Sequence, residues 1–343
     1  MRLAAIVGCL GTELTKAEIE LYQKMTPLGF ILFKKNCINP AQVRALTSQI
    51  RELLADDKAP IMIDQEGGEV IRMGPPGWPD ILAFSEFGEL AEINYNLAVK
   101  LLKLSTQAVS EELKEVGINV IASPCLDLSY KFAHKVIGKR SFSANPDITS
   151  RLARQVVDIF LSNKITPIIK HIPGHGRALV DSHFALPEVK ASLDQLEQTD
   201  FKPFLRLNRS PWAMTAHIKY KSLDAKRAVT LSKKALQFIR KYFDYQGILI
   251  SDCISMKALG GNFSKIVPPA FAAGIDIVLC SQGSLADFAE VLKLSPVINK
   301  KLINRLNLFQ SPYQTTASDG VKPDYWRAME QVKKELKLAI LKK

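Results

Sequence analysis

Eight short apolar runs, rich in β-branched residues, constrain the fold of this chain more than any other feature. They are residues 3–8, 29–33, 60–64, 118–123, 166–170, 212–217, 247–252 and 275–280. Apolar residues follow one another within these runs and do not alternate with polar ones. This pattern is typical of strands covered on both faces, as in parallel sheets.

Helical segments are predicted between most of the runs. Several carry capping signals: Thr15 with Glu18, Asn39-Pro40, Asn145-Pro146, Ser192 with Gln195, and Ser232. Two further amphipathic helices are expected over residues 89–116 and, with a basic face, over roughly residues 325–341.

Strands alternating with helices predict an α/β fold of the (β/α)₈ TIM-barrel type. A doubly wound open sheet is the alternative, but the first strand–helix turn has no GxGxxG motif. No repeat, low-complexity tract or linker divides the 343 residues. We therefore expect one domain, with a catalytic barrel over residues 1–310 and a C-terminal helical tail, residues 311–343, packed on the barrel.

Composition limits the partners and the compartment. No apolar run approaches the roughly 20 residues that span a bilayer, and the start MRLAAIVGCLG indicates a buried strand more than a lipoprotein leader. The five cysteines lack metal-ligand spacing and suit a reducing compartment, so we expect a cytoplasmic protein. The net charge of +12 lacks an aromatic-interleaved basic motif, which favours a solvated basic surface over nucleic-acid binding.

Polar side chains end four of the predicted strands. Asp64 ends the third, Lys170 and His171 the fifth, His217 the sixth and Asp252 the seventh. Active sites of (β/α)₈ barrels lie at the carboxyl ends of the strands. Four strands would thus bring acids, bases and cations to one face, which favours a functional site over isolated structural pairs.

The stretch from Lys170 to His183, KHIPGHGRALVDSH, is the strongest candidate for a catalytic loop. Pro173, Gly174 and Gly176 oppose a helix, and the irregular segment is expected to run from residue 172 to about residue 190. That length exceeds the roughly 12–15 residues above which a structureless loop is usually functional or disordered.

The residue types suggest acid–base chemistry. Asp252 follows an apolar strand and is either a structural acceptor or an ionised nucleophile. Asp181 and His183 are two residues apart, so in extended chain they share a face and the carboxylate can orient the imidazole. A fixed carboxylate with an assisted histidine fits a two-step displacement at a sugar carbon.

Five polar residues are candidate anchors for sugar hydroxyls and an acyl group: Asp64, Arg72, Arg140, Lys170 and His171. A metal site formed by His171, His175, Asp181 and His183 is the alternative, but the spacing matches no standard motif and Lys170 would repel a cation. His175 as a loop stabiliser and His217 as a core residue remain open alternatives.

The central segment, KHIPGHG followed by DSH, resembles the signature of glycoside hydrolase family 3, specifically its bacterial β-N-acetylglucosaminidases. Further segments of the family pattern occur in order over roughly residues 8–285: GTELTKAE, GFILFKKN, IDQEGGEVIRM, IGKRSF, MTAHIKY, GILISDCISMKAL and AAGIDIVL.

The resemblance implies roles for individual residues. Asp252 would be the nucleophile, His183 the proton donor and Asp181 its partner. The same five polar residues would bind the sugar. It also implies a retaining exo-β-N-acetylglucosaminidase (β-N-acetylhexosaminidase) that forms a covalent glycosyl–aspartate. This enzyme would remove terminal N-acetylglucosamine from anhydro-muropeptides in peptidoglycan recycling. We expect a cytoplasmic monomer with a carbohydrate substrate and no metal, other cofactor, nucleic-acid partner or membrane partner.

The sequence departs from the family pattern at three positions. Arg177 stands where an aspartate usually follows GHG, Cys253 replaces a second aspartate, and Glu69 replaces a common arginine. None of these positions carries an assigned chemical role.

Two rival functions remain open. In a phosphorylase, phosphate would intercept the glycosyl-enzyme, because a neutral histidine repels phosphate less than a glutamate does. A non-catalytic sugar-binding barrel is the more distant alternative, and the intact Asp252, Asp181 and His183 oppose it.

Overall fold

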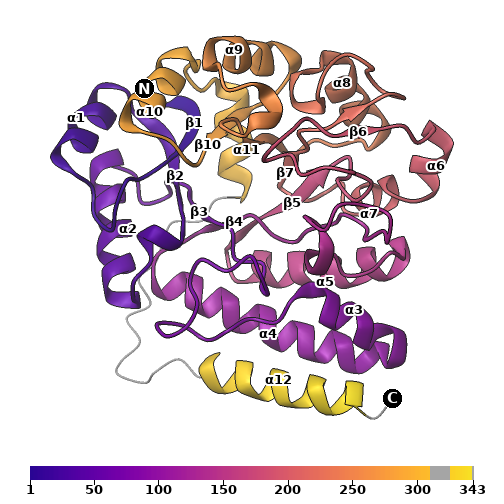
Figure 1. The fold of residues 1–343 in the computed structure, drawn as a ribbon. Coiled ribbons are helices and arrows are strands. Elements are labelled where there is room, and N and C mark those ends of the chain that lie inside the picture. Colours follow the sequence, from indigo (N-terminus) through magenta and orange to yellow (C-terminus); the bar gives the residue numbers. More distant parts are fainter. Residues whose placement is uncertain (310–324, 342–343) are drawn as a thin grey trace.

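A closed barrel of eight parallel strands forms the centre of the molecule. The structure, a computed structural model, describes residues 1–309 and 325–341. The strands follow the order β1-β10-β9-β7-β5-β4-β3-β2 around the barrel (Figure 1). Their bounds are β1 (Leu3–Gly8), β2 (Pro27–Leu32), β3 (Ile61–Ile63), β4 (Val120–Ile121), β5 (Thr166–Ile172), β7 (Trp212–Thr215), β9 (Ile248–Cys253) and β10 (Ile277–Cys280). Each predicted strand is present, and closure confirms the barrel over the open sheet.

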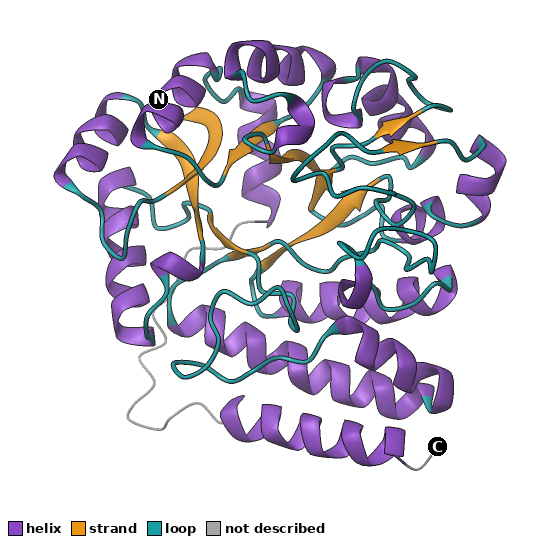
Figure 2. Cartoon of the chain, viewed as in Figure 1, coloured by secondary structure: helices purple, strands orange, loops and turns teal. Residues whose placement is uncertain are grey.

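Helices surround the strands on the outside of the barrel (Figure 2). They are α1 (Lys16–Lys24), α2 (Pro40–Leu54), α3 (Phe84–Ile93), α4 (Tyr95–Glu115), α5 (Pro146–Ser162), α6 (Leu193–Gln198), α7 (Phe201–Arg206), α8 (Lys233–Tyr242), α9 (Phe263–Ala273), α10 (Leu285–Leu294), α11 (Lys300–Phe309) and α12 (Tyr325–Leu341). Short 3₁₀ turns are η1 (Lys34–Asn36), η2 (Gly138–Arg140), η3 (Val229–Leu231) and η4 (Lys257–Leu259). The predicted capping boxes of α1 and α6 are both formed, which confirms these helix starts.

The single helix expected over residues 89–116 is wrong. The chain forms α3 and α4, which are separated at Asn94. The Asn94 side-chain oxygen accepts a hydrogen bond of 3.0 Å from the backbone N–H of Leu97, so it caps the second helix. A capping side chain inside an amphipathic pattern therefore marked a helix start.

The loop after β5 is less irregular than expected. β5 extends to Ile172, and residues 188–189 form β6 (Glu188–Val189). β6 pairs in parallel with β8 (Lys219–Tyr220), outside the barrel. The irregular segment is therefore shorter than the predicted 172–190, and its far end is held by backbone hydrogen bonds.

Two apolar layers hold the fold together. Side chains that point into the barrel, such as Ile6, Met62, Ile168 and Trp212, form one buried cluster. Outward side chains pack against the helices and form a second, larger cluster. α11 adds Leu302 and Leu306 to the inner cluster. The inner layer makes the barrel a solid core, so chemistry is confined to the loops above it.

α12 lies along α4 at the outer edge of the molecule, and it also contacts α3 (Figure 1). Its predicted bounds agree with the structure. The predicted boundary between barrel and tail, at residues 310 and 311, lies outside the described residues. Among the helices of the described ranges, none is both long and apolar enough to cross a membrane.

A substitution at Gly88 tests the contact between α3 and the loop before α5. A Cβ at this position would lie 1.6 Å from the backbone oxygen of Phe142. Gly88→Ala should therefore lower the free energy of unfolding by at least about 2 kcal/mol in urea denaturation, although alanine is the better helix former. Gly11→Ala is the control, because the nearest atom would be 3.8 Å away. Unchanged stability of Gly88→Ala would contradict this packing.

Candidate active site

The predicted site residues converge at the carboxyl ends of the barrel strands. A cavity of about 130 Å³ is lined by seven of them: Asp64, Arg72, Arg140, Lys170, His171, His183 and Asp252. A second cavity, of about 270 Å³, shares Asp64, Arg72, His183 and Asp252 and extends towards η4. Asp181 lines neither cavity. The two cavities therefore meet at the candidate nucleophile and proton donor.

A buried ion network forms the floor of the first cavity. The Lys170 ammonium lies 2.8 Å from Asp64 and 2.5 Å from Glu66. Arg140 donates two hydrogen bonds of 2.8 Å to the two oxygens of Glu66. Arg72 lies 3.4 Å from Asp64. Charges are thus paired within the network, as buried charges require.

The network keeps its groups ionised. Burial alone would raise the pKa of Glu66, but Arg140 and Lys170 outweigh burial and hold that pKa at about 2. Burial would likewise lower the pKa of Lys170, yet Asp64 and Glu66 raise it. The site therefore presents fixed cations and anions to a ligand near neutral pH.

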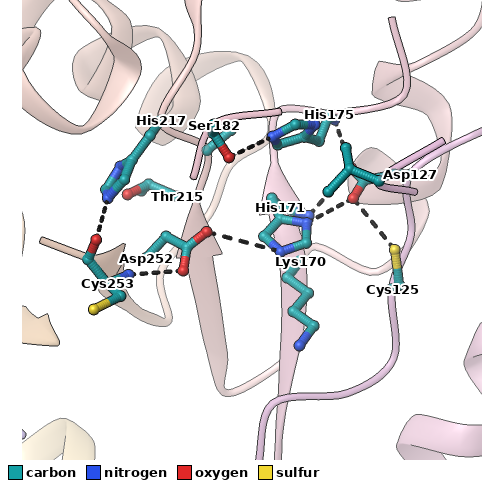
Figure 3. A network of polar contacts seen from close by, with 12 residues as sticks. Cys125, Asp127, Lys170, His171, His175, Ser182, Thr215, His217, Asp252 and Cys253 are labelled. Carbon is teal, nitrogen blue, oxygen red and sulfur yellow. Dashed lines mark hydrogen bonds and ion pairs between the residues drawn. The ribbon is translucent and has the colours of Figure 1, made fainter. Parts of the chain in front are cut away.

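His171 is fixed by a residue that the sequence analysis missed, Asp127. The His171 Nδ1 atom lies 2.6 Å from one Asp127 oxygen, and the other oxygen accepts from the backbone N–H groups of His171 (3.2 Å) and His175 (2.6 Å). Figure 3 shows the Asp127 carboxylate between these groups and Cys125. Asp127 holds the ring so that its Nε2 faces the cavity side, 3.4 Å from Arg140 and 4.0 Å from Asp252.

Asp252 is the next-to-last residue of β9, and one of its two carboxylate oxygens accepts a backbone hydrogen bond. Its Oδ1 accepts a 2.7 Å hydrogen bond from the backbone N–H of Cys253, while Oδ2 lies towards His171 (Figure 3). Burial would raise the pKa of Asp252, but His171 and His217 outweigh burial and lower it. The carboxylate is thus an ionised group at the junction of the two cavities.

Asp181 and His183 form a hydrogen-bonded pair on the loop. The Asp181 Oδ1 atom lies 2.8 Å from His183 Nδ1 and accepts from the backbone N–H of His183 at 2.9 Å. The His183 side chain is 60% exposed. The loop is tied to η4 by a 3.3 Å hydrogen bond from the backbone N–H of Ala258 to the oxygen of Ser182. The two side chains meet as predicted, but they do so in a turn and not in extended chain, because the backbone oxygen of Asp181 accepts from the N–H groups of Phe184 and Ala185.

His217 and His175 have structural partners. His217 is buried beyond the end of β7, where its ring contacts Thr230 Oγ1 (2.8 Å) and the backbone oxygen of Cys253 (3.1 Å). His175 Nε2 lies 3.1 Å from Ser182 Oγ. His217 therefore links η3 to the end of β9, and His175 links the start of the loop to Ser182.

Of the three departures from the family pattern, Arg177 and Glu69 line neither cavity, whereas Cys253 lines the second one. Arg177 forms a 2.6 Å ion pair with Asp200 and stacks 4.5 Å from the centre of the Tyr130 ring. Glu69 is exposed. Cys253 is buried, with its sulfur 3.0 Å from Ser255 Oγ, and lines the second cavity.

Within the described residues, the group close enough to share a metal ion is Cys125, Asp127 and His171. The alternative set considered from the sequence does not come together there. His183 pairs with Asp181 on the exposed loop, whereas His175 turns to Ser182. Asp127 and His171 already bond each other, so an ion would compete with that hydrogen bond.

Asp127 and Glu66 were not assigned roles from the sequence. The pairing of Glu66 depends on Arg140, which lies 74 positions later in the sequence. Asp127 lies in the apolar stretch Cys125–Leu128, and a lone carboxylate in such a stretch was the available signal.

The buried His175 gives a pH prediction. Burial, aided by His171, lowers the pKa of His175 from 6.5 to about 4. Between these values the unfolded chain binds a proton that the folded protein does not, so stability falls as pH falls. His175→Gln should reduce the slope of the unfolding free energy between pH 6.5 and 4.5 by up to about 1.4 kcal/mol per pH unit in urea denaturation. The same change at exposed His134 is the control, and an unchanged slope in His175→Gln would contradict this account.

The chain is similar in sequence to known β-hexosaminidases. The chain is 32% identical to a β-hexosaminidase of Chromobacterium violaceum over 88% of this chain and 85% of the relative. It is 29% identical to a β-hexosaminidase of Bordetella avium over 93% of this chain and 91% of the relative.

Solved structures agree with the fold. NagZ from Neisseria gonorrhoeae superposes with a TM-score of 0.86 at 28% identity, covering 98% of both chains. It has also been solved in complex with N-trifluoroacetyl-D-glucosamine and, separately, with a zinc ion.

The family profile described as "Glycosyl hydrolase family 3 N terminal domain" matches residues 9–307, which include every barrel strand after β1. The chain therefore belongs to glycosyl hydrolase family 3.

Proposed function

We propose that this family 3 glycoside hydrolase is a retaining exo-β-N-acetylhexosaminidase that removes terminal non-reducing N-acetylglucosamine. The observation that carries the proposal is the meeting of an ionised Asp252 and the Asp181–His183 pair beside a wall of fixed polar groups. The β-hexosaminidase relatives and the gonococcal NagZ structure with a glucosamine derivative support the choice of sugar.

The reaction has two steps. Asp252 attacks the anomeric carbon and forms a glycosyl ester, while the bond from that carbon to the leaving oxygen breaks and His183 gives its proton to that oxygen. His183 then takes a proton from water, whose oxygen attacks the same carbon and releases Asp252. Each step inverts the anomeric centre, so the product retains its configuration.

The buried network would hold the sugar during both steps. Asp64 and Arg72 line both cavities, whereas Arg140, Lys170 and His171 line the first alone. Carboxylate, ammonium and guanidinium groups bind hydroxyl and acyl oxygens through charge-assisted hydrogen bonds. We assign these five residues to the sugar and assign Asp181 to orienting His183.

We propose peptidoglycan fragments, in particular anhydro-muropeptides, as the natural substrates, and a monomeric cytoplasmic enzyme that needs no metal. The sequence resemblance supports the substrate. All five cysteines are free and buried, as suits a reducing compartment.

Incubation with the 4-nitrophenyl β-glycosides of N-acetylglucosamine, glucose and galactose tests the proposal. Turnover of the N-acetylglucosaminide alone, with N-acetylglucosamine as product, is expected. Sugar 1-phosphate as the main product in phosphate buffer would support a phosphorylase. The absence of turnover on all glycosides, with N-acetylglucosamine still bound, would support a sugar-binding barrel.

Replacing the nucleophile gives a direct test. Asp252→Asn should lower kcat by at least about three orders of magnitude, because an amide cannot form the glycosyl ester, while sugar binding and folding persist. Asp57→Asn, an exposed position, is the matched control. A purified Asp252→Asn enzyme with a tenth of the wild-type rate would refute the assignment.

Replacing Asp181 tests the proton donor. Asp181→Asn keeps the shape of the side chain but removes the charge beside the His183 ring, so proton donation by His183 should weaken. A sugar leaving group needs the proton, so its hydrolysis should slow far more than that of an activated nitrophenyl glycoside. Equal slowing of both substrates would show instead that Asp181 only tethers the loop.

A further inference from the structure

A large open pocket of about 960 Å³ lies beside the two active-site cavities, and the proposed chemistry does not use it. Its walls come from the loop after β5, the segment before α8, and η4 with α9. All three segments follow barrel strands β5, β7 and β9, and the lining runs along α9 from Ser264 to Ala273.

The pocket is strongly basic. Lys226, Arg227, Lys233 and Lys265 are exposed and line it, and no acidic side chain does. Within the described residues, none of these four side chains forms an ion pair. Asp224 attracts Arg227 but is engaged elsewhere, by Ser232 Oγ at 2.7 Å and by backbone N–H groups. The four cations thus produce an uncompensated positive field in a concave surface.

The pocket continues the line along which a leaving group would depart. All five residues assigned to the sugar line the first cavity, whereas only two of them, Asp64 and Arg72, also line the second. Asp252 and His183 line both cavities. The second cavity is therefore the side for the leaving group. Lys257 lines that cavity, and the next two residues of η4 line the basic pocket.

The residues between the second cavity and the basic pocket are partly apolar. The oxygen of Ser182, next to the candidate proton donor, accepts from the N–H of Ala258, which lines the basic pocket. The Lys257 ammonium lies 5.8 Å from the centre of the exposed Phe184 ring. Leu186 and Pro268 add apolar surface inside the basic pocket. A ligand in the basic pocket would contact both cationic and aliphatic side chains.

We propose that this basic pocket is a binding site for the acidic, carboxylate-bearing part of the leaving group, such as a peptide with free carboxylates attached to the leaving sugar. The inference rests on the proposed function and adds where the distal part of the substrate is held. Lys257 is the link between the reacting bond and the pocket, and the four cations attract the carboxylates.

A matched pair of substrates isolates this charge recognition. One is N-acetylglucosaminyl-β-1,4-anhydro-N-acetylmuramic acid with a tripeptide bearing free carboxylates, and the other is the same compound with those carboxylates amidated. The triple variant Lys226→Gln, Arg227→Gln, Lys265→Gln should lower kcat/KM for the acidic substrate about five- to tenfold at low salt. The difference should shrink as salt rises, because exposed charges are screened beyond roughly 8 Å at physiological ionic strength.

Two controls test whether the loss of kcat/KM comes from the pocket charges and not from general damage to the enzyme. The triple variant should hydrolyse the amidated substrate and the 4-nitrophenyl N-acetylglucosaminide within about twofold of wild type. A control triple, Lys58→Gln, Lys103→Gln and Lys293→Gln, removes the same charge at exposed positions that do not line the pocket, and should leave all three rates unchanged.

Failure of the pocket assignment and failure of the proposed function would give different results. Wild-type turnover of both muropeptides with no preference for the acidic one, or equal losses on both substrates in the triple variant, overturns the pocket assignment alone. Stimulation of nitrophenyl glycoside hydrolysis by the free tripeptide would also overturn it, since the pocket would then hold a separate effector. Absence of turnover on every substrate overturns the proposed function and this inference with it.

Discussion

The buried ammonium of Lys170 is the constraint on which the candidate site depends. Its residue is 1% exposed, and a charge removed from water in this way is tolerated only with close partners. Asp64 and Glu66 supply them from the end of β3, and Glu66 in turn needs Arg140 from η2. One buried cation thus fixes the relative positions of three segments far apart in sequence.

Because buried charges need close partners, the candidate site has a fixed, buried part and a separate, exposed part. The proposed sugar anchors Asp64, Lys170 and His171 lie in or directly after barrel strands, and Arg72 and Arg140 reach this region from loops. His183 sits on a loop, 60% exposed, with Asp181 as its ring partner. A group that exchanges protons with water benefits from access to water, whereas groups that position a sugar benefit from rigidity.

The fold was predictable because its signals are local. Continuous apolar runs mark doubly covered strands, and capping pairs such as Thr15 with Glu18 mark helix starts within a few residues. The break at Asn94 was missed because both helices share one amphipathic pattern, and the pairing of β6 with β8 was missed because each has only two residues.

The site was predictable only where a residue acts through its place at a strand end or its spacing on the loop. Asp252, Lys170 and the Asp181–His183 pair have such signals. Asp127 has none of this kind, because its role is to accept hydrogen bonds from His171 and His175, more than 40 positions away. Residues so far apart in sequence are brought together by the closed barrel, and no local sequence pattern predicts their contact.

Arg177 shows how a departure from the family pattern is accommodated. A cation near the loop would disturb the charge balance around His183 if it were free. Arg177 is instead paired with Asp200 and stacked on Tyr130, and it lines neither active-site cavity. Its charge is therefore neutralised outside the site, and its contacts join the base of the loop to α7 through the residue before that helix. The contacts of Arg177 thus lie at the base of the loop, outside both cavities.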